Sequence, residues 1–202
     1  MELISLKYAI FVIVLLVLYY CFPKKYRWYV LLAGSMAYYV IICKWYVLFI
    51  IFTICTTYGS TIWIDKLLKK QNAIVKSHKE DWDRQTRKDY KEKGRKKRVA
   101  VMLFALLCNF GILAFLKYIP YAGELGLLLP LGISFYTFQS MGYVMDVYRE
   151  IVEPEKNFLK VALFVSFFPQ IIQGPIAIYD KLAGQLYEGH SLRLENLQKG
   201  AL

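Results

Sequence analysis

Residues 129–149 form the stretch of sequence that decides the fold, and they read LPLGISFYTFQSMGYVMDVYR. If this stretch is a helix, steps of four and three residues place five polar or small residues on one face, namely Gly132, Tyr136, Gln139, Tyr143 and Asp146. Facing lipid, this polar stripe would leave amide, phenol and carboxylate groups without partners at several kcal/mol each. We therefore expect it to face protein, through interhelical hydrogen bonds, or to line a water-filled cavity, and the spacing leaves both open.

The composition around this stretch is typical of a membrane protein. The chain has 202 residues, of which 57% are hydrophobic and 20% are charged, and its mean hydropathy is +0.37. One soluble core cannot bury so many apolar side chains, which argues against a soluble enzyme. A helix needs about 20 apolar residues to cross a bilayer. Six charge-free stretches approach that length: 8–22, 28–43, 45–64, 99–116, 125–145 and 161–179. The predicted fold class is therefore all-α, a polytopic transmembrane helical bundle of about six spans.

Most of the net charge lies in one interval. Residues 65–98 hold 14 Lys and Arg against 6 Asp and Glu, so they carry +8 of the chain's +11. Basic loops favour the cytoplasmic side of a membrane. We expect a basic cytoplasmic loop here, as a solvated helix or a flexible segment, with the N-terminus outside. Its charge would attract anionic lipid, and its few aromatic residues argue against a nucleic-acid partner.

The join between the second and third stretches is short. Only Lys44 separates 28–43 from 45–64. We expect either a tight hairpin of two spans or a partly interfacial element.

The sixth stretch also mixes polar and helix-breaking residues. Ser166, Gln170 and Gln173 fall at i, i+4 and i+7, and Pro169 and the pair Gly174-Pro175 interrupt the helical ladder. A helix broken at membrane depth predicts a buried pocket, because freed carbonyls need protein or water as partners. A merely kinked structural helix is the open alternative.

The two polar stripes are expected to meet. Consecutive spans joined by a short loop tend to pack side by side. We therefore expect Gln139 and Tyr143 to approach Gln170 and Gln173 around a shared cavity, whereas Val144, off the stripe, should point outward.

Cysteines and histidines offer no catalytic or metal centre. The four cysteines stand singly in apolar runs, without a CxxC pair, so we expect small core residues and no metal site; they are Cys21, Cys43, Cys55 and Cys108. His78 lies in the basic loop, and His190 follows the sixth span. Neither is placed in an apolar helix as a shielded general base would be, so no catalytic residue is predicted in this chain.

A pocket or tunnel lining is the one kind of site that the sequence predicts. It is assigned to the polar residues of the fifth and sixth spans, which are Tyr136, Gln139, Tyr143, Asp146, Gln170 and Gln173.

Several strings of the chain resemble a known family. In the second half they are PLGISFYTFQ at 130–139, DVYR at 146–149, EKNF at 155–158 and FFPQ at 167–170, followed by Gly174-Pro175. In the first half they are Pro23, Tyr26, Arg27, Trp28 and Ser35. Together these residues resemble the membrane-bound O-acyltransferase family, and within it the bacterial branch that contains the membrane subunit of alginate O-acetylation.

The resemblance implies an enzyme of the bacterial cell membrane. Such a multi-pass protein would transfer an acyl group, with acetyl as the expected group. The acceptor would be a hydroxyl of an extracellular polysaccharide, or a periplasmic or extracellular acetyltransferase partner that completes the transfer. The donor implied is an acyl thioester, acetyl-CoA or an acyl carrier, with no tightly bound cofactor. The family's catalytic histidine lies beyond the matched region, so the chain alone is expected to be inactive. The rival interpretation is a non-catalytic membrane scaffold or transporter-like module.

Four parts are expected along the chain. Residues 1–64 hold the first three transmembrane helices, 65–98 the basic loop, 99–179 the last three helices with the family-like strings, and 180–202 the start of an amphipathic helix. Leu194, Leu197 and Ala201 lie on one face of that helix, and no capping or breaking signal follows before Leu202. We therefore expect the chain to be the N-terminal portion of a larger fold of this family.

Overall fold

The computed structural model describes residues 6–78, 81–118, 132–173 and 178–189. These residues are mostly helical, and no strand occurs among them, so the all-α fold class is confirmed. In this described part the α-helices are α1 (Leu6–Cys21), α2 (Arg27–Cys43), α3 (Val47–Ser77), α4 (Arg84–Tyr118), α6 (Ile133–Tyr148), α7 (Phe158–Ser166), α8 (Phe168–Gln173) and α9 (Tyr179–Tyr187). Short 3-10 turns at Lys24–Tyr26 and Lys44–Tyr46 precede α2 and α3.

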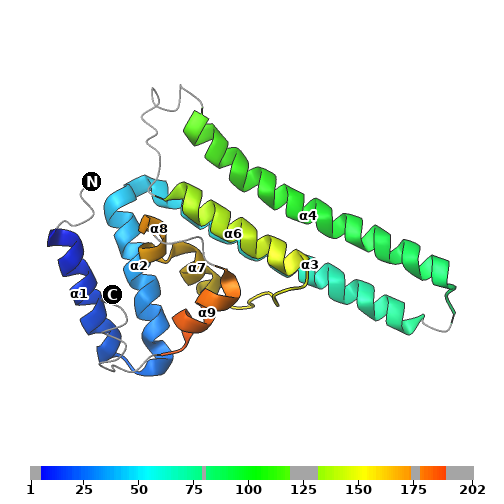
Figure 1. The fold of residues 1–202 in the computed structure, drawn as a ribbon, viewed down its shortest axis with the longest axis horizontal. Helices are drawn as coiled ribbons and strands as arrows, with labels where there is room; N and C mark the ends of the chain where they lie inside the picture. The colour runs from blue at the N-terminus through cyan, green and yellow to red at the C-terminus, as the bar shows by residue number, and fades with distance from the viewer. Residues whose placement is uncertain (1–5, 79–80, 119–131, 174–177, 190–202) are drawn as a thin grey trace.

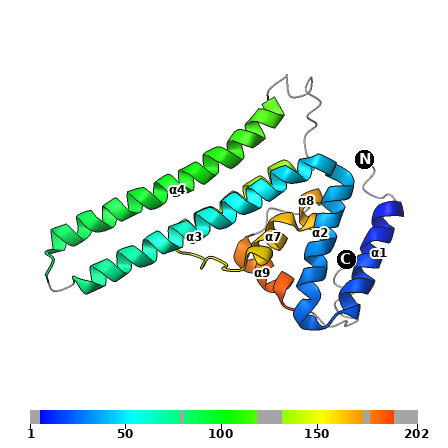
Figure 2. The ribbon, with the colours of Figure 1, turned by 180° about the vertical axis from the view of Figure 1, so that it is seen from behind.

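The helices form two connected groups (Figures 1 and 2). The long helices α3 and α4 run side by side, and α6 packs against both of them. At the other end of the molecule α1 packs on α2. The short helix α7 contacts both α2 and α3 and so joins the two groups, with α9 against α7 and α8 against α2. The predicted polar stripe on α6 therefore lies near the junction of the two groups.

The outer surface of the bundle is apolar, whereas its interior contains several polar side chains. On α3 the buried residues include Thr53, Thr57 and Thr61, whereas Trp63 is 57% exposed. On α4 the amide of Asn109 is buried, while Leu107 is 73% exposed. This is the reverse of a water-soluble helix, and it suits side chains that face lipid. The segments Lys24–Ser77 and Arg84–Tyr118 are long and apolar enough to cross a membrane, and together with this surface they indicate a membrane protein.

The basic interval 65–98 is not a loop over most of its length. Helix α3 continues to Ser77 and α4 begins at Arg84, so of the two expected forms the structure has the helical one. Lys, Arg, Glu and Gln are good helix formers, and pairs such as Asp65 with Lys69, at 2.6 Å, add support one turn apart. Helix α3 passes through residue 65 and α4 through residue 98 without interruption.

The join at Lys44 is a bend rather than a tight hairpin. Lys44 adopts a left-handed φ of 48°, which is uncommon for a residue with a side chain. Helix α2 ends before it at Cys43 and α3 starts at Val47. From this turn the two helices diverge in both views (Figures 1 and 2), so they do not pack along their lengths.

Several smaller predictions need correction. Cys21 and Cys55 are exposed on the apolar surface instead of lying in the core, whereas Cys43 is buried as expected. The described part of the fifth span begins at Ile133, after Gly132 takes a left-handed φ of 70°. The sixth span is broken into α7 and α8, which is one of the two expected forms, but the break falls at Phe167, before Pro169. The expected apolar face at Leu194, Leu197 and Ala201 lies outside the described residues, as does His190.

Candidate functional site

The polar stripe on α6 is buried in protein. The exposed fractions of Tyr136, Gln139 and Tyr143 are 1%, 2% and 1%. Burial extends beyond the stripe, because Val144 is 0% exposed, and the expectation that it points outward is wrong. Helix α6 contacts α3, α4, α7 and α8, so it is enclosed on more than one side.

Gln139 meets the point where α7 breaks. Helix α7 ends at Ser166, and Phe167 has a non-helical ψ of 100° before α8 begins. A continuous helix would pair the amide of Phe168 with the carbonyl of Phe164. Here the Phe164 carbonyl instead accepts a hydrogen bond of 2.8 Å from Gln139 Nε2. The Phe168 amide lies 3.5 Å from the hydroxyl of Ser35 on α2. Two other helices thus provide partners for both groups that the break frees.

Tyr143 connects α6 to the segment before α7. Its hydroxyl accepts a hydrogen bond of 2.8 Å from the backbone amide of Glu155. Its ring stacks on Tyr179 of α9, with centroids 4.1 Å apart, and meets Phe164 edge to face at 5.8 Å. Tyr143 therefore fixes the relative positions of α6, α7 and α9.

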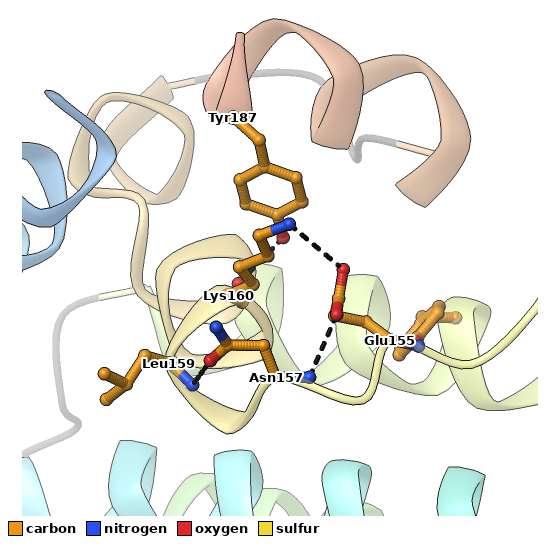
Figure 3. A network of polar contacts seen from close by, with 6 residues as sticks. Glu155, Asn157, Leu159, Lys160 and Tyr187 are labelled. Atoms are coloured by element: carbon orange, nitrogen blue, oxygen red, sulfur yellow. Dashed lines mark hydrogen bonds and ion pairs between the residues drawn. The ribbon is translucent and has the colours of Figure 1, made fainter. Parts of the chain in front are cut away.

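A network of polar contacts surrounds the N-terminal end of α7 (Figure 3). Asn157 is the N-cap of α7 and accepts a hydrogen bond of 3.0 Å from the amide of Leu159. The carboxylate of Glu155 accepts from the amide of Asn157 at 2.9 Å and lies 3.7 Å from Lys160 Nζ. The Tyr187 hydroxyl donates to the carbonyl of Lys160 at 2.8 Å. Burial raises the pKa of Tyr187, so its phenol keeps this donor even at a pH where an exposed tyrosine would ionise.

Three of the predicted lining residues are not among the partners in the contacts described above. Asp146 is half-buried near the end of α6, and Gln170 is half-buried on α8. Gln173 ends α8, and its side chain lies outside the described residues. The expected approach of Gln139 and Tyr143 to Gln170 and Gln173 therefore stays a prediction, as does the assignment of all six residues to a pocket lining.

Three buried hydroxyls around this region have no hydrogen-bond partner within the described part of the chain. They belong to Tyr136 and Ser140 on α6 and to Ser166 at the end of α7. Buried polar groups are normally paired. The ring of Tyr136 lies edge to face on Tyr39 of α2, at 6.4 Å. The junction of the two helix groups thus contains buried hydroxyl groups whose hydrogen-bonding capacity is not used within the described residues.

Sequence reasoning missed some residues of this network. Ser35, Glu155, Lys160 and Tyr187 received no role, although Ser35 and Glu155 stand in the family-like strings. Asn157 could have been found, because an Asn just before an apolar run is a common N-cap.

His78 has a structural place at the tip of the α3–α4 hairpin. It is the C-cap of α3, its Nδ1 lies 3.2 Å from the carbonyl of Ile74, and its ring stacks on Trp82 at 4.8 Å. Among the described residues no cluster of His, Cys, Asp and Glu could hold a metal ion.

The fold and these contacts define a class of membrane protein whose apolar helices enclose hydrogen-bonded polar residues. Comparisons with curated proteins find bacterial relatives that are named as O-acetylating enzymes. The chain is 40% identical over 74 residues to a probable alginate O-acetylase of Pseudomonas syringae pv. tomato, which covers 37% of this chain and 14% of that relative. It is 36% identical over 91 residues to the protein of the same name in Azotobacter vinelandii, covering 45% and 17%.

A third relative acts on another polymer by name. It is the peptidoglycan O-acetyltransferase of Helicobacter pylori, 30% identical to this chain over 49% of the chain and 26% of the relative. The chain therefore spans about a quarter or less of the length of these relatives. No protein-family profile and no solved structure matches it. The similarity to the alginate O-acetylation branch of the membrane-bound O-acyltransferases is confirmed by these relatives.

Proposed function

We propose that this chain forms part of a membrane-bound O-acyltransferase that moves an acetyl group to hydroxyls of an extracellular polysaccharide, or to an extracytoplasmic partner that completes the transfer. The observation that carries the proposal is the similarity to relatives named as alginate and peptidoglycan O-acetylating enzymes. The buried polar residues of α6 and α7 support it, because acyl transfer needs a site that excludes water from a reactive thioester.

In this proposal the stripe residues form part of the wall of the transfer site. Gln139 and Tyr143 hold α7 in place through the carbonyl of Phe164 and the amide of Glu155. The unpaired hydroxyls of Tyr136 and Ser166 offer donors toward a bound acyl or sugar oxygen. Asp146, Gln170 and Gln173 complete the proposed wall.

The donor is proposed to be an acyl thioester from the cytoplasm, acetyl-CoA or an acyl carrier. The basic residues of the α3–α4 hairpin would favour such an anionic compound electrostatically. A histidine from outside this chain is proposed as the general base for the acceptor hydroxyl. We therefore propose that the 202-residue chain alone is inactive.

The proposed topology has six crossings with the N-terminus outside. Three observations support the proposal that the segments after α1, α3 and α6, which carry basic residues, lie on the same, cytoplasmic side of the membrane. Arg98 at the base of the hairpin lies 3.8 Å from Glu150, after α6. Tyr58 donates to the carbonyl of Lys156, before α7. Helices α1 and α2, and likewise α3 and α4, also run in opposite directions (Figure 1), as successive crossings of a membrane require.

The proposed function is tested in the cell that carries the gene. Disrupting it should remove most O-acetyl groups from the surface polysaccharide, measured as acetate released by mild alkali, and wild-type complementation should restore them. Unchanged acetyl content after disruption would contradict acyl transfer and favour the scaffold interpretation. In vitro, the purified chain with acetyl-CoA and polysaccharide should release thiol no faster than buffer.

A further inference from the structure

A groove lies at the base of the α3–α4 hairpin, away from the stripe on α6. It has a volume of about 710 Å³ and is lined by residues of α3, of α4 and of the turn after α6. This volume is in the range of sites for small organic ligands. Five of the lining residues are basic: Lys88, Lys91, Arg95, Lys96 and Arg98.

Arg98 is the buried cation of this groove. Only 8% of the residue is exposed. Its Nη1 donates to Gln71 Oε1 at 2.9 Å, and its Nη2 lies 3.8 Å from a carboxylate oxygen of Glu150. The Nε donor is buried and has no partner among the described residues. A buried guanidinium normally satisfies its donors, so Arg98, a residue that lines the groove, keeps one donor unused.

The two acidic residues of the groove leave an excess of positive charge. Glu92 pairs with Lys96 of its own helix at 3.1 Å, and both side chains are exposed. Glu150 faces Arg98 at 3.8 Å, too far for a hydrogen bond, and its side chain is 54% exposed. Three further cations then remain, Lys88, Lys91 and Arg95, at i, i+3 and i+7 along one face of α4.

The groove is held open by the packing of the two helices beside it. A side chain on Gly94 of α4 would collide with the amide group of Gln71, so glycine permits this close approach. Gln71 Nε2 in turn lies 3.4 Å from the carbonyl of Lys91. The position of Arg98 therefore depends on helix packing rather than on a mobile surface side chain.

We infer that this groove binds a phosphate-bearing ligand. A guanidinium combined with ammonium groups is the donor set that recognises phosphate oxygens. The site lies where the charged part of α4 meets its apolar part at Val99, so a soluble phosphorylated compound and a lipid headgroup could both reach it. The inference does not depend on the proposed acyl transfer.

Binding is tested on the whole chain in nanodiscs of phosphatidylcholine, with pyrophosphate as the probe in calorimetric titrations. The groove variant Lys91→Gln with Arg95→Gln should weaken binding about tenfold or more, because two charge-assisted contacts are lost. The matched control Lys70→Gln with Lys93→Gln removes the same charge from the same two-helix hairpin outside the groove. It should change the dissociation constant by less than about twofold, since neither side chain lines the groove and both are exposed to salt. Circular dichroism checks that both variants stay helical.

A second measurement distinguishes the two sources of phosphate. Native mass spectrometry follows phosphatidylglycerol retained from mixed nanodiscs. Retention by the wild type but not by the groove variant assigns a lipid headgroup, and equal retention assigns a soluble compound. The inference is overturned if pyrophosphate does not bind the wild type, or if the control variant weakens binding as much as the groove variant.

Discussion

Gln139 shows what a single polar side chain can do between apolar helices. It lies on α6 and donates to the carbonyl of Phe164, which the end of α7 leaves without a helical partner. Both residues are buried, at 2% and 0% exposed. In such surroundings water cannot replace a missing donor, so the amide is the means by which α6 stabilises a broken helix.

Replacing Gln139 with leucine should lower the free energy of unfolding by about 1 to 2 kcal/mol, the range found for one hydrogen bond in a membrane. The expected cause is the carbonyl of Phe164, which loses its hydrogen-bond donor, rather than the difference in side-chain volume between glutamine and leucine. Unfolding of the chain in mixed micelles, followed by circular dichroism, measures the change. The control is Phe138→Leu, at the neighbouring position, where the ring is 48% exposed. Equal losses in the two variants would contradict a role for the hydrogen bond.

The residues of the stripe could be predicted from spacing, but their partners could not. Alternating steps of four and three correctly predicted that Tyr136, Gln139 and Tyr143 avoid lipid. The partner of Gln139 depends on where α7 breaks, and Ser35 meets Phe168 across 133 residues of sequence. Val144 was misplaced because a polar pattern reveals one buried face of a helix and not the number of its neighbours.

At the scale of elements, the α3–α4 hairpin decides between the two forms, helix or flexible segment, that the charge pattern left open. A charged interval predicts solvent exposure, and most of these side chains are exposed. It does not by itself distinguish a loop from a helix, since Lys, Glu and Arg suit both. The residues that favour the packed helical form are Gly94 and Gln71. The absence of a side chain at Gly94 leaves room for Gln71, so two charged helices can pack closely.

Gly94→Ala should destabilise this hairpin. The added methyl group would lie 2.7 Å from Cδ of Gln71 and displace an amide that accepts from Arg98. We expect a loss of about 1 to 2 kcal/mol in the free energy of unfolding, because a buried guanidinium loses a partner. Gly111→Ala is the control on the same helix, with nothing within 4 Å of the new methyl group.

The control should have the opposite sign. Gly111→Ala is expected to stabilise α4 by about 0.5 to 1 kcal/mol, through helix propensity alone. Chemical unfolding of both variants, monitored by helix content, gives the comparison. If Gly94→Ala also stabilises the chain, the close approach of Gly94 to Gln71 contributes nothing to hairpin packing.

At the scale of the whole molecule, the length of the apolar part of α4 can be compared with the thickness of a bilayer. The apolar part of α4, residues 99–118, is about 30 Å long at 1.5 Å per residue, which matches the hydrocarbon core of a bilayer. The charged part, 84–98, extends about 22 Å further. A membrane placed on the apolar surface leaves the hairpin standing in the aqueous phase.

The proposed topology can be measured with reporters. A reporter inserted within 76–97 should read cytoplasmic, because that interval is strongly basic, and one near Gly123 should read extracytoplasmic, because residues 119–131 contain no Lys or Arg. Alkaline phosphatase and a fluorescent protein, fused at each point, report opposite sides. A cytoplasmic reading near Gly123 would exclude six crossings.

The hairpin has a practical consequence for imaging. At 23.7 kDa, with its mass hidden in a micelle, this chain offers little contrast for particle alignment in electron cryomicroscopy. Because α3 and α4 continue unbroken out of the apolar region, a soluble helical protein grafted in frame onto their tips would inherit the orientation of the buried helices. The helical pair thus provides a handle by which the membrane-embedded half of the molecule could be visualised.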